Sequence, residues 1–264
     1  MIMKIEELIE EIEAIAPPHL QEAWDNSGVQ LLPGAYVEAK KVLVCLEITD
    51  AVVVEAIAAE ADFIVTHHPL IFDGVKRIDY QSAKGRYLVQ LIKNGISVYS
   101  AHTSFDSVLG GNNDYLAHML GVSDLSPIEA IDKIGNGMGR IGSFPKELKF
   151  GNVVDLVKGA LGNSDYLRTV GDYGSIVRKV GICTGSGADL LDRAKAMGCD
   201  MFITGDLKYH EARHAEEIGI CAIDAGHFGT ENIFTENFAD QLFSKIGDRA
   251  EIIKSKVDIN PFEW

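Results

Sequence analysis

The chain has 264 residues, 47% of them apolar and 24% charged, a composition that excludes disordered and collagen-like proteins. Its 24 Lys and Arg stand against 39 Asp and Glu, a net charge of −15, so nucleic-acid binding is not expected. No apolar run in the sequence reaches membrane-spanning length, and the charged N-terminal stretch lacks the features of a signal peptide. We therefore expect a cytoplasmic protein with no membrane contact.

Short β-branched runs alternate with helical stretches through the first half of the chain. After an amphipathic N-terminal stretch, the pattern predicts a strand, a helix, a strand, a helix and a strand over residues 41–48, 50–61, 62–68, 82–95 and 96–106. The second of these helices ends at Gly95, a residue typical of helix C-termini. This alternation predicts an α/β fold.

The second half of the chain repeats the same order. Strands and helices alternate over residues 179–185, 188–198, 199–206, 208–219 and 220–231. The strand that begins at Lys41 can be laid over the one that begins at Lys179, and His102 then falls over His227 after a shift in offset. We interpret this as an internal pseudo-duplication that gives two similar α/β domains, over residues 1–127 and 128–264, with an approximate boundary and possible interlocking.

Two features carry no chemistry of their own. The glycine-rich stretch 134–144 has the wrong spacing for a dinucleotide-binding loop and is predicted to be a turn or strand edge. The four cysteines form no Cys-x-x-Cys pair, and three lie in apolar strands. They are expected to be buried thiols in a reducing compartment.

Three predicted strands end in side chains that bind metals. The segments are THHPLIF, SAHTSFD and DAGHFGTE, which contain His67 and His68, His102 and Asp106, and His227 and Glu231. Each pair alone has an ordinary explanation: solvated rings in a turn, an N-cap aspartate, or a glutamate in the first turn of a helix. Together they stand at the carboxyl ends of strands, where sites form in parallel sheets.

The donor set favours a dinuclear metal site. Imidazole nitrogens and carboxylate oxygens without sulfur suit Zn, Mn, Fe or Co, and sequence does not choose among them. Five ligands exceed the usual three of a catalytic zinc and suit two ions. The five are His67, His68, Asp106, His227 and Glu231. Thr66, Asp206 and His210 are expected to support them through hydrogen bonds.

These segments, together with WDNSGVQL (24–31) and GDLKYHEA (205–212), resemble the Nif-three-like family, whose members are often labelled GTP cyclohydrolase I type 2 homologues. The resemblance spans about Trp24 to Glu231 and corresponds to the short form without an inserted domain. It implies two similar α/β domains with the metal site in the cleft between them, and a ring-shaped homohexamer built as a trimer of dimers. The family's metal ligands fall on the same five positions.

The metal site would suit hydrolysis of a small molecule. Two adjacent ions would lower the pKa of a bridging water to give a hydroxide nucleophile, and His102 or His210 would move a proton. The expected substrate is a nucleotide or other small heterocycle or phosphoester, contacted by Trp24, Asp25 and Asn26; core or turn roles for these three stay open. The alternative is a non-enzymatic metal-binding scaffold, metallochaperone or sensor.

Overall fold

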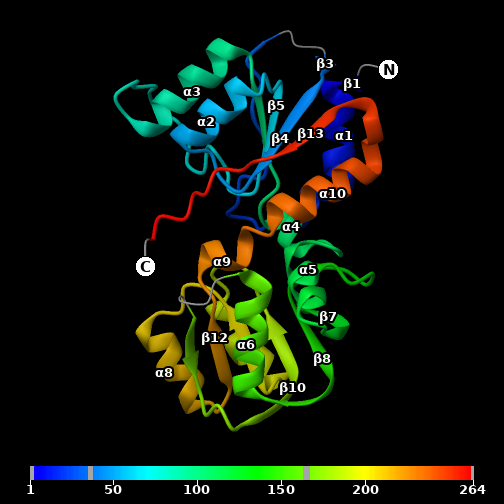
Figure 1. The fold of residues 1–264 in the computed structure, drawn as a ribbon, viewed down its shortest axis with the longest axis vertical. Helices are drawn as coiled ribbons and strands as arrows, with labels where there is room; N and C mark the ends of the chain where they lie inside the picture. Colours follow the sequence, from blue (N-terminus) through cyan, green and yellow to red (C-terminus); the bar gives the residue numbers. More distant parts are fainter. Residues whose placement is uncertain (1–2, 35–37, 163–166, 263–264) are drawn as a thin grey trace. The chain divides into compact units, whose positions relative to one another are not determined.

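The computed structural model describes residues 3–34, 38–162 and 167–262. The chain forms two compact units, one made of the residues up to Val108 together with those from Phe234 onward, and the other of Leu109–Ile233. Figure 1 shows the elements of each unit. Among the described residues, no helix is long and apolar enough to cross a bilayer.

The first unit is built on a five-stranded sheet of order β13-β4-β5-β6-β2. Strands β13, β4, β5 and β6 are parallel, and β2 is antiparallel at the edge. Its elements are β1 (Met3–Lys4), α1 (Ile5–Ile15), η1 (Pro18–Leu20), β2 (Gly28–Leu31), β3 (Glu38–Ala39), β4 (Lys41–Cys45), α2 (Asp50–Ala58), β5 (Phe63–Thr66), α3 (Ala83–Asn94), β6 (Ser97–Ser100), α4 (Thr103–Ser107), α10 (Phe234–Ile246), η3 (Gly247–Arg249) and β13 (Glu251–Lys254).

The second unit contains a six-stranded sheet of order β7-β8-β10-β11-β12-β9. Strands β10, β11 and β12 are parallel, and β9 is antiparallel at the edge. Its elements are α5 (Asn112–Met119), β7 (Ser123–Ala130), β8 (Gly137–Lys149), α6 (Phe150–Leu161), β9 (Arg168–Val170), β10 (Ile176–Ile182), η2 (Ala188–Leu190), α7 (Leu191–Ala196), β11 (Met201–Thr204), α8 (Tyr209–Glu217), β12 (Cys221–Asp224) and α9 (His227–Glu231).

Local sequence explains where the helices begin and end. The Thr49 hydroxyl accepts the backbone N–H of Val52 at the start of α2, and the Ser82 hydroxyl caps α3. Helix α3 ends at Gly95, which adopts a left-handed φ of 70° that glycine reaches without steric cost. Strands β5 and β6 are buried along their full length, as expected for parallel strands covered on both faces.

The division of the chain differs from two consecutive halves split at residue 127. The C-terminal segment returns to the first unit, where β13 pairs in parallel with β4, from Glu251 opposite Lys41 to Lys254 opposite Val44. Strand β7, at residues 123–130, pairs with β8 in the second unit. Strand pairing between residues far apart in sequence therefore sets the boundary, and no local change in composition marks it.

The two sheets share one feature that the expected duplication requires. Each has three successive parallel strands, β4-β5-β6 and β10-β11-β12, and one antiparallel edge strand beside the third. In each unit the third parallel strand is followed by a five-residue helix, α4 or α9. The strands predicted to run to residues 106 and 231 therefore stop at Ser100 and Asp224, because the chain then turns into these helices. The duplication itself stays a prediction.

The glycine-rich and cysteine-containing segments adopt ordinary structural roles. Residues 137–149 form β8, which pairs with β7 and β10, so the glycine-rich stretch runs into a strand. All four cysteines are buried, and none of them forms a disulfide. Burial raises the pKa of the Cys45 thiol far above its usual range and that of Cys199 to about 11, so these thiols are protonated near neutral pH.

Candidate metal centre

Three histidines of the first unit gather where parallel strands end. Thr66 is in register with Ser100 on β6, so the turn after β5 and the turn after β6 lie side by side. The ligand nitrogens of His67, His68 and His102 lie within 4.8 Å of one another. The Thr66 hydroxyl donates to the His68 carbonyl at 2.8 Å and lies 2.7 Å from the Ser100 hydroxyl, which fixes the histidine turn.

A carboxylate completes this first cluster. Asp106, on α4, places Oδ2 3.6 Å from His67 Nε2, and both side chains are almost fully buried. Helix α4 is held against the core by Phe105, whose ring contacts Phe234 and Phe238 at centroid distances of 5.3 and 5.1 Å. Core packing of Phe105 therefore points its neighbour Asp106 toward the histidines.

Asp25 is the residue that orients His102. Its Oδ1 accepts from His102 Nδ1 at 2.7 Å, and its Oδ2 accepts from the hydroxyls of Thr103 at 2.6 Å and Ser27 at 2.7 Å. Burial works to raise the pKa of the Asp25 carboxyl, but the hydrogen bonds from His102, Thr103 and Ser27 outweigh it and hold that pKa well below its usual range. Asp25 is therefore ionised and pairs with His102.

The second unit carries a pair of the predicted ligands on α9. His227 Nε2 lies 2.9 Å from Glu231 Oε2, four residues later on the same helical face. His227 Nδ1 lies 2.8 Å from Asp206 Oδ2. Asp206 follows β11 and adopts a φ of +56°, a left-handed conformation that costs free energy in a non-glycine residue. The fold therefore accepts local strain where Asp206 meets His227.

Glycines make room for these groups. A Cβ atom at Gly185 would lie 2.1 Å from Glu231 Oε1 and 3.5 Å from His227 Nε2, and one at Gly205 would lie 2.6 Å from the backbone of Gly226. Gly185 also has a φ of +69°. The loops after β10, β11 and β12 can therefore meet closely only because these positions lack side chains.

The four histidines share one hydrogen-bonding pattern. Each has an oxygen acceptor at Nδ1: the Ala101 carbonyl at 2.9 Å for His67, Glu47 at 3.4 Å for His68, Asp25 at 2.7 Å for His102 and Asp206 at 2.8 Å for His227. In a neutral imidazole, an Nδ1–H that donates to such an oxygen makes Nε2 the nitrogen that can ligate a metal. This is the arrangement found in histidines that ligate metals through Nε2.

The structure places the other predicted residues at the periphery of these clusters. Trp24 is 60% exposed, and its ring centroid lies 5.9 Å from that of His102 and 6.0 Å from that of Phe72. The Asn26 amide donates to the Ile71 carbonyl at 2.5 Å. His210 is exposed on α8, where its ring packs edge-on against Tyr209.

The sequence does not indicate which histidines two of the supporting carboxylates contact. Asp25 lies 77 positions before His102, and Glu47 lies 21 positions before His68. Neither belongs to a recognisable spacing pattern, and only the fold brings them together. Of the supporting residues expected from sequence, Thr66 contacts His68 and Asp206 contacts His227, two of the predicted ligands.

Comparison with known proteins identifies the family. Residues 3–261 match the family model described as Duf34/NIF3 (NGG1p interacting factor 3). The chain belongs to the DUF34/NIF3 family. A Clostridium perfringens protein named GTP cyclohydrolase 1 type 2 homolog is 36% identical, with 99% of this chain and 100% of that protein covered.

Solved structures of DUF34/NIF3 relatives share the fold of the whole chain. A Bacillus cereus protein related to NIF3 has a TM-score of 0.92 at 25% identity, with 100% of this chain and 99% of that one covered. A Staphylococcus aureus hypothetical protein has a TM-score of 0.91 at 26% identity, with both chains fully covered. The family expected from the sequence motifs is thus confirmed, and the chain has His, Asp and Glu groups that can bind a metal.

Proposed function

We propose that this protein is a metal-dependent hydrolase in which both units hold one pair of divalent cations. The observation that carries the proposal is shared by the four histidines: each has an oxygen acceptor at Nδ1, the arrangement of histidines that ligate metals through Nε2. The proposed ligands are the five side chains expected from the sequence, His67, His68, Asp106, His227 and Glu231.

Chain connectivity supports the use of both units. The chain passes from the first unit to the second after Val108 and returns before Phe234. Asp106 lies two residues before the first crossing, and Glu231 lies two residues before the second. Each unit thus has a histidine nitrogen and a buried carboxylate close in sequence to a point where the chain passes from one unit to the other. Neither unit alone offers all five proposed ligands.

The donor set fits borderline divalent ions such as Zn, Mn, Fe or Co. When bound, such a pair would supply a Lewis acid and a water of lowered pKa. The protein's own residues perform the remaining tasks. His102 takes up or releases a proton at Nε2, because Asp25 holds Nδ1–H and pairs with the positive charge that results. Asp25 thereby fixes both the ring orientation and the tautomer of His102.

The proposed substrate is a nucleotide or another small heterocycle or phosphoester. The exposed face of Trp24 beside His102 offers a stacking surface for a flat ring. Asn26 keeps its side-chain oxygen as an acceptor after its amide has donated to Ile71. His210 is retained as a second proton carrier, on the exposed face of α8.

A turnover assay on metal-loaded protein tests the proposal. We expect hydrolysis of at least one member of a nucleotide and phosphoester panel. His102→Ala should abolish turnover without changing the bound metal content, and His19→Ala, which removes an exposed histidine of the same unit, should change neither. Two bound ions with no turnover on any substrate would contradict the hydrolase and favour the metallochaperone or scaffold alternative.

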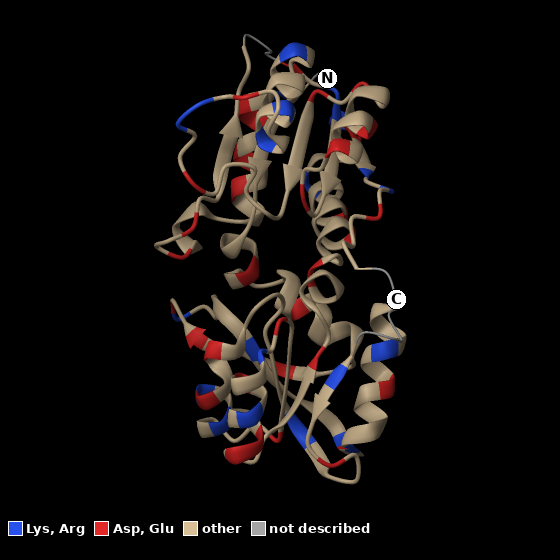
Figure 2. Cartoon of the chain, turned by 90° about the vertical axis from the view of Figure 1, so that its left-hand side faces the viewer, with Lys and Arg blue, Asp and Glu red and all other residues tan. Residues whose placement is uncertain are grey.

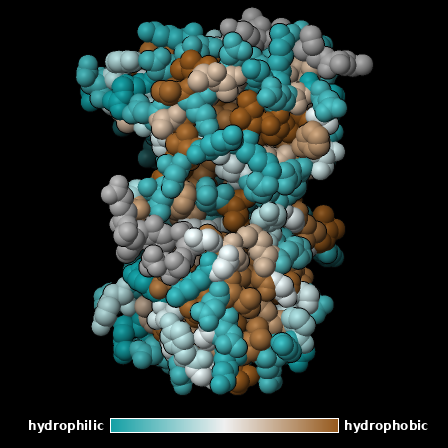
Figure 3. Space-filling model, viewed as in Figure 1, coloured by the Kyte–Doolittle hydropathy of each residue, from teal (hydrophilic) through white to brown (hydrophobic). Residues whose placement is uncertain are grey.

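We also propose the homohexameric assembly that the family resemblance implies. Exposed apolar side chains on the loop between β5 and α3 support it, with Phe72 47%, Val75 40%, Ile78 55% and Tyr80 49% exposed. Figure 3 shows brown hydrophobic atoms among teal hydrophilic ones on the face of the molecule that it displays. Light scattering should give six times the 28.8 kDa chain mass, and a monomer mass would contradict the assembly.

A further inference from the structure

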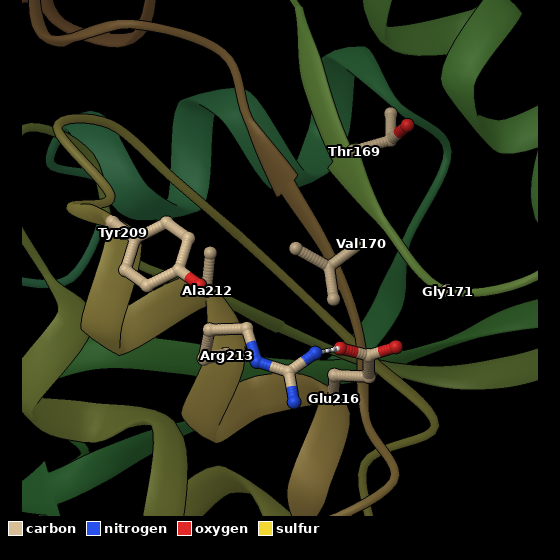
Figure 4. Close-up of a pocket in the computed structure, with 7 residues that line it drawn as sticks. All are labelled: Thr169, Val170, Gly171, Tyr209, Ala212, Arg213 and Glu216. Atoms are coloured by element: carbon tan, nitrogen blue, oxygen red, sulfur yellow. Dashed lines mark hydrogen bonds and ion pairs between the residues drawn. The ribbon is translucent and has the colours of Figure 1, made fainter.

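A groove in the second unit lies between the edge strand β9 and helix α8. Two cavities of about 260 and 220 Å³ share Thr169, Val170, Tyr209 and Ala212 as lining residues. In Figure 4, Tyr209, Ala212, Arg213 and Glu216 come from α8, and Thr169 and Val170 come from β9. Each cavity is smaller than the roughly 300 Å³ at which pockets for drug-sized ligands begin, so the groove suits a small ligand.

The smaller cavity is lined by two cations and one anion. Arg168, Lys208 and Asp224 all line it. Arg168 uses its Nη2 nitrogen to bond both Asp224 and the Leu207 carbonyl, while its side chain stays 68% exposed. Among the described residues, its Nε and Nη1 donors make no hydrogen bond. A buried carboxylate therefore holds this guanidinium in place with donors left for a ligand.

Lys208 adds a second charge that is only loosely paired. Its Nζ lies 3.7 Å from Glu211 Oε1, and its side chain is 81% exposed. In the larger cavity, Arg213 is already paired with Glu216. The exposed cationic groups that an anion can reach thus lie at the Arg168–Lys208 end of the groove, in a chain whose overall charge is −15. Figure 2 shows acidic and basic residues interspersed along the elements of the chain.

An aromatic ring lies next to these cations. Tyr209 is 72% exposed, lines both cavities and follows Lys208 directly in the chain. Ala212, three residues later on α8, has a methyl side chain that leaves space beside the ring. A flat ring can therefore stack on Tyr209 while an attached oxyanion reaches Lys208 and Arg168.

We propose that this groove binds a small oxyanion attached to a planar ring, a phosphate or a carboxylate. The groove is joined to the metal-binding half of the same unit: Leu207 follows Asp206, the partner of His227, and the Leu207 N–H donates to Asp224 at 3.1 Å. Asp224 also accepts from the N–H of Gly226 at 3.0 Å. Through this link the groove would also orient the substrate of the metal centre, and this second part of the proposal rests on the proposed function.

Ligand-observed NMR on metal-free protein tests the groove without the metal centre. The probes are phenyl phosphate, benzoate and the neutral benzamide. We expect both anions to bind and benzamide to bind at least about tenfold more weakly, because a charge-assisted hydrogen bond contributes roughly a factor of ten or more. Tighter binding of phenyl phosphate identifies phosphate as the natural group, and tighter binding of benzoate identifies carboxylate.

Exposed positions allow substitutions that leave the fold intact. Lys208→Gln and Tyr209→Ala should each weaken phenyl phosphate binding about three- to tenfold. Lys146→Gln and Tyr80→Ala, which change other exposed side chains of the same types, should leave it unchanged. Equal binding to all four variants, equal binding of benzamide, or no binding by the unmodified protein would overturn the proposal.

The metal content of the variants separates this proposal from the proposed function. Lys208→Gln should bind divalent ions as the unmodified protein does, since Lys208 is not one of the five proposed ligands. Loss of ring-anion binding with normal metal content supports the groove. Normal ring-anion binding in a protein that takes up no metal would contradict the proposed function and leave the groove in place.

Discussion

Replacing Gly185 by alanine distinguishes an effect on metal affinity from an effect on the stability of the fold. The added Cβ would lie 2.1 Å from Glu231 Oε1 and 3.0 Å from its Cδ, distances that van der Waals contact does not allow. Because the carboxylate is the far end of a flexible side chain, it can move aside while the backbone stays in place. Gly185→Ala should therefore displace a proposed metal ligand and cost the fold no more than the backbone strain of alanine at this position.

The expected magnitudes follow from the two effects. Alanine at the φ of +69° found at Gly185 costs about 1–2 kcal/mol of the free energy of unfolding. Gly219 has the same φ of +69° with no atom within 4 Å of its added Cβ, so Gly219→Ala is a matched control for backbone strain. Only Gly185→Ala should weaken divalent-ion binding, by at least about tenfold, because losing even a supporting partner of a ligand typically costs 10–100-fold and Glu231 is itself a proposed ligand.

Two measurements on each variant decide the outcome. Thermal unfolding without metal should show similar losses for both alanines. A competition titration with a chromophoric chelator should show weakened zinc or manganese binding in Gly185→Ala and unchanged binding in Gly219→Ala. Unchanged binding in Gly185→Ala would refute the position assigned to Glu231, and equal weakening in both variants would attribute the effect to backbone strain.

Three other predictions concern the residues that hydrogen-bond the histidines and the stabilisation that bound metal provides. Asp206→Asn should lower metal affinity about tenfold, because it removes the charge that holds His227; Asp192→Asn, which removes a surface His–Asp pair, should not, and chelator competition compares them. Asp25→Asn should lower the free energy of unfolding by about 2–4 kcal/mol at pH 7. Since the folded-state pKa of Asp25 is depressed, that difference should be constant above its unfolded value and shrink as the pH falls below about 4; a pH-independent difference in denaturant titrations would contradict it. Metal at 100 times its Kd should stabilise the protein by about 2.7 kcal/mol, with reversal by chelator and no gain in His67→Ala, as measured by thermal unfolding.

Local patterns in the sequence predict much of the fold and the proposed ligands. The helix over residues 82–95 matches α3, because a capping serine and a terminal glycine are both local signals. His67 and His68 could be placed at a strand end, because an apolar run precedes them and Pro69 follows. These features depend on neighbouring residues, which periodicity and turn chemistry describe well.

Features that depend on distant residues could not be predicted in this way. The pairing of β13 with β4 joins residues near 251 to residues near 41, and no periodicity reports such a pairing. The hydrogen bond from His102 to Asp25 spans 77 positions. The sequence leaves open whether Asp25 contacts substrate or forms a turn, and the structure pairs both of its oxygens with protein donors. Tertiary contacts thus give this carboxylate a positioning role.

Anomalous diffraction from crystals grown with zinc or manganese tests the central claim most directly. The account predicts two strong peaks per chain, at about 2.0–2.2 Å from the Nε2 atoms of His67, His68 and His227 for zinc, with Asp106 and Glu231 in contact. Absence of a peak at these nitrogens, or a metal peak bound only elsewhere on the chain, would contradict it.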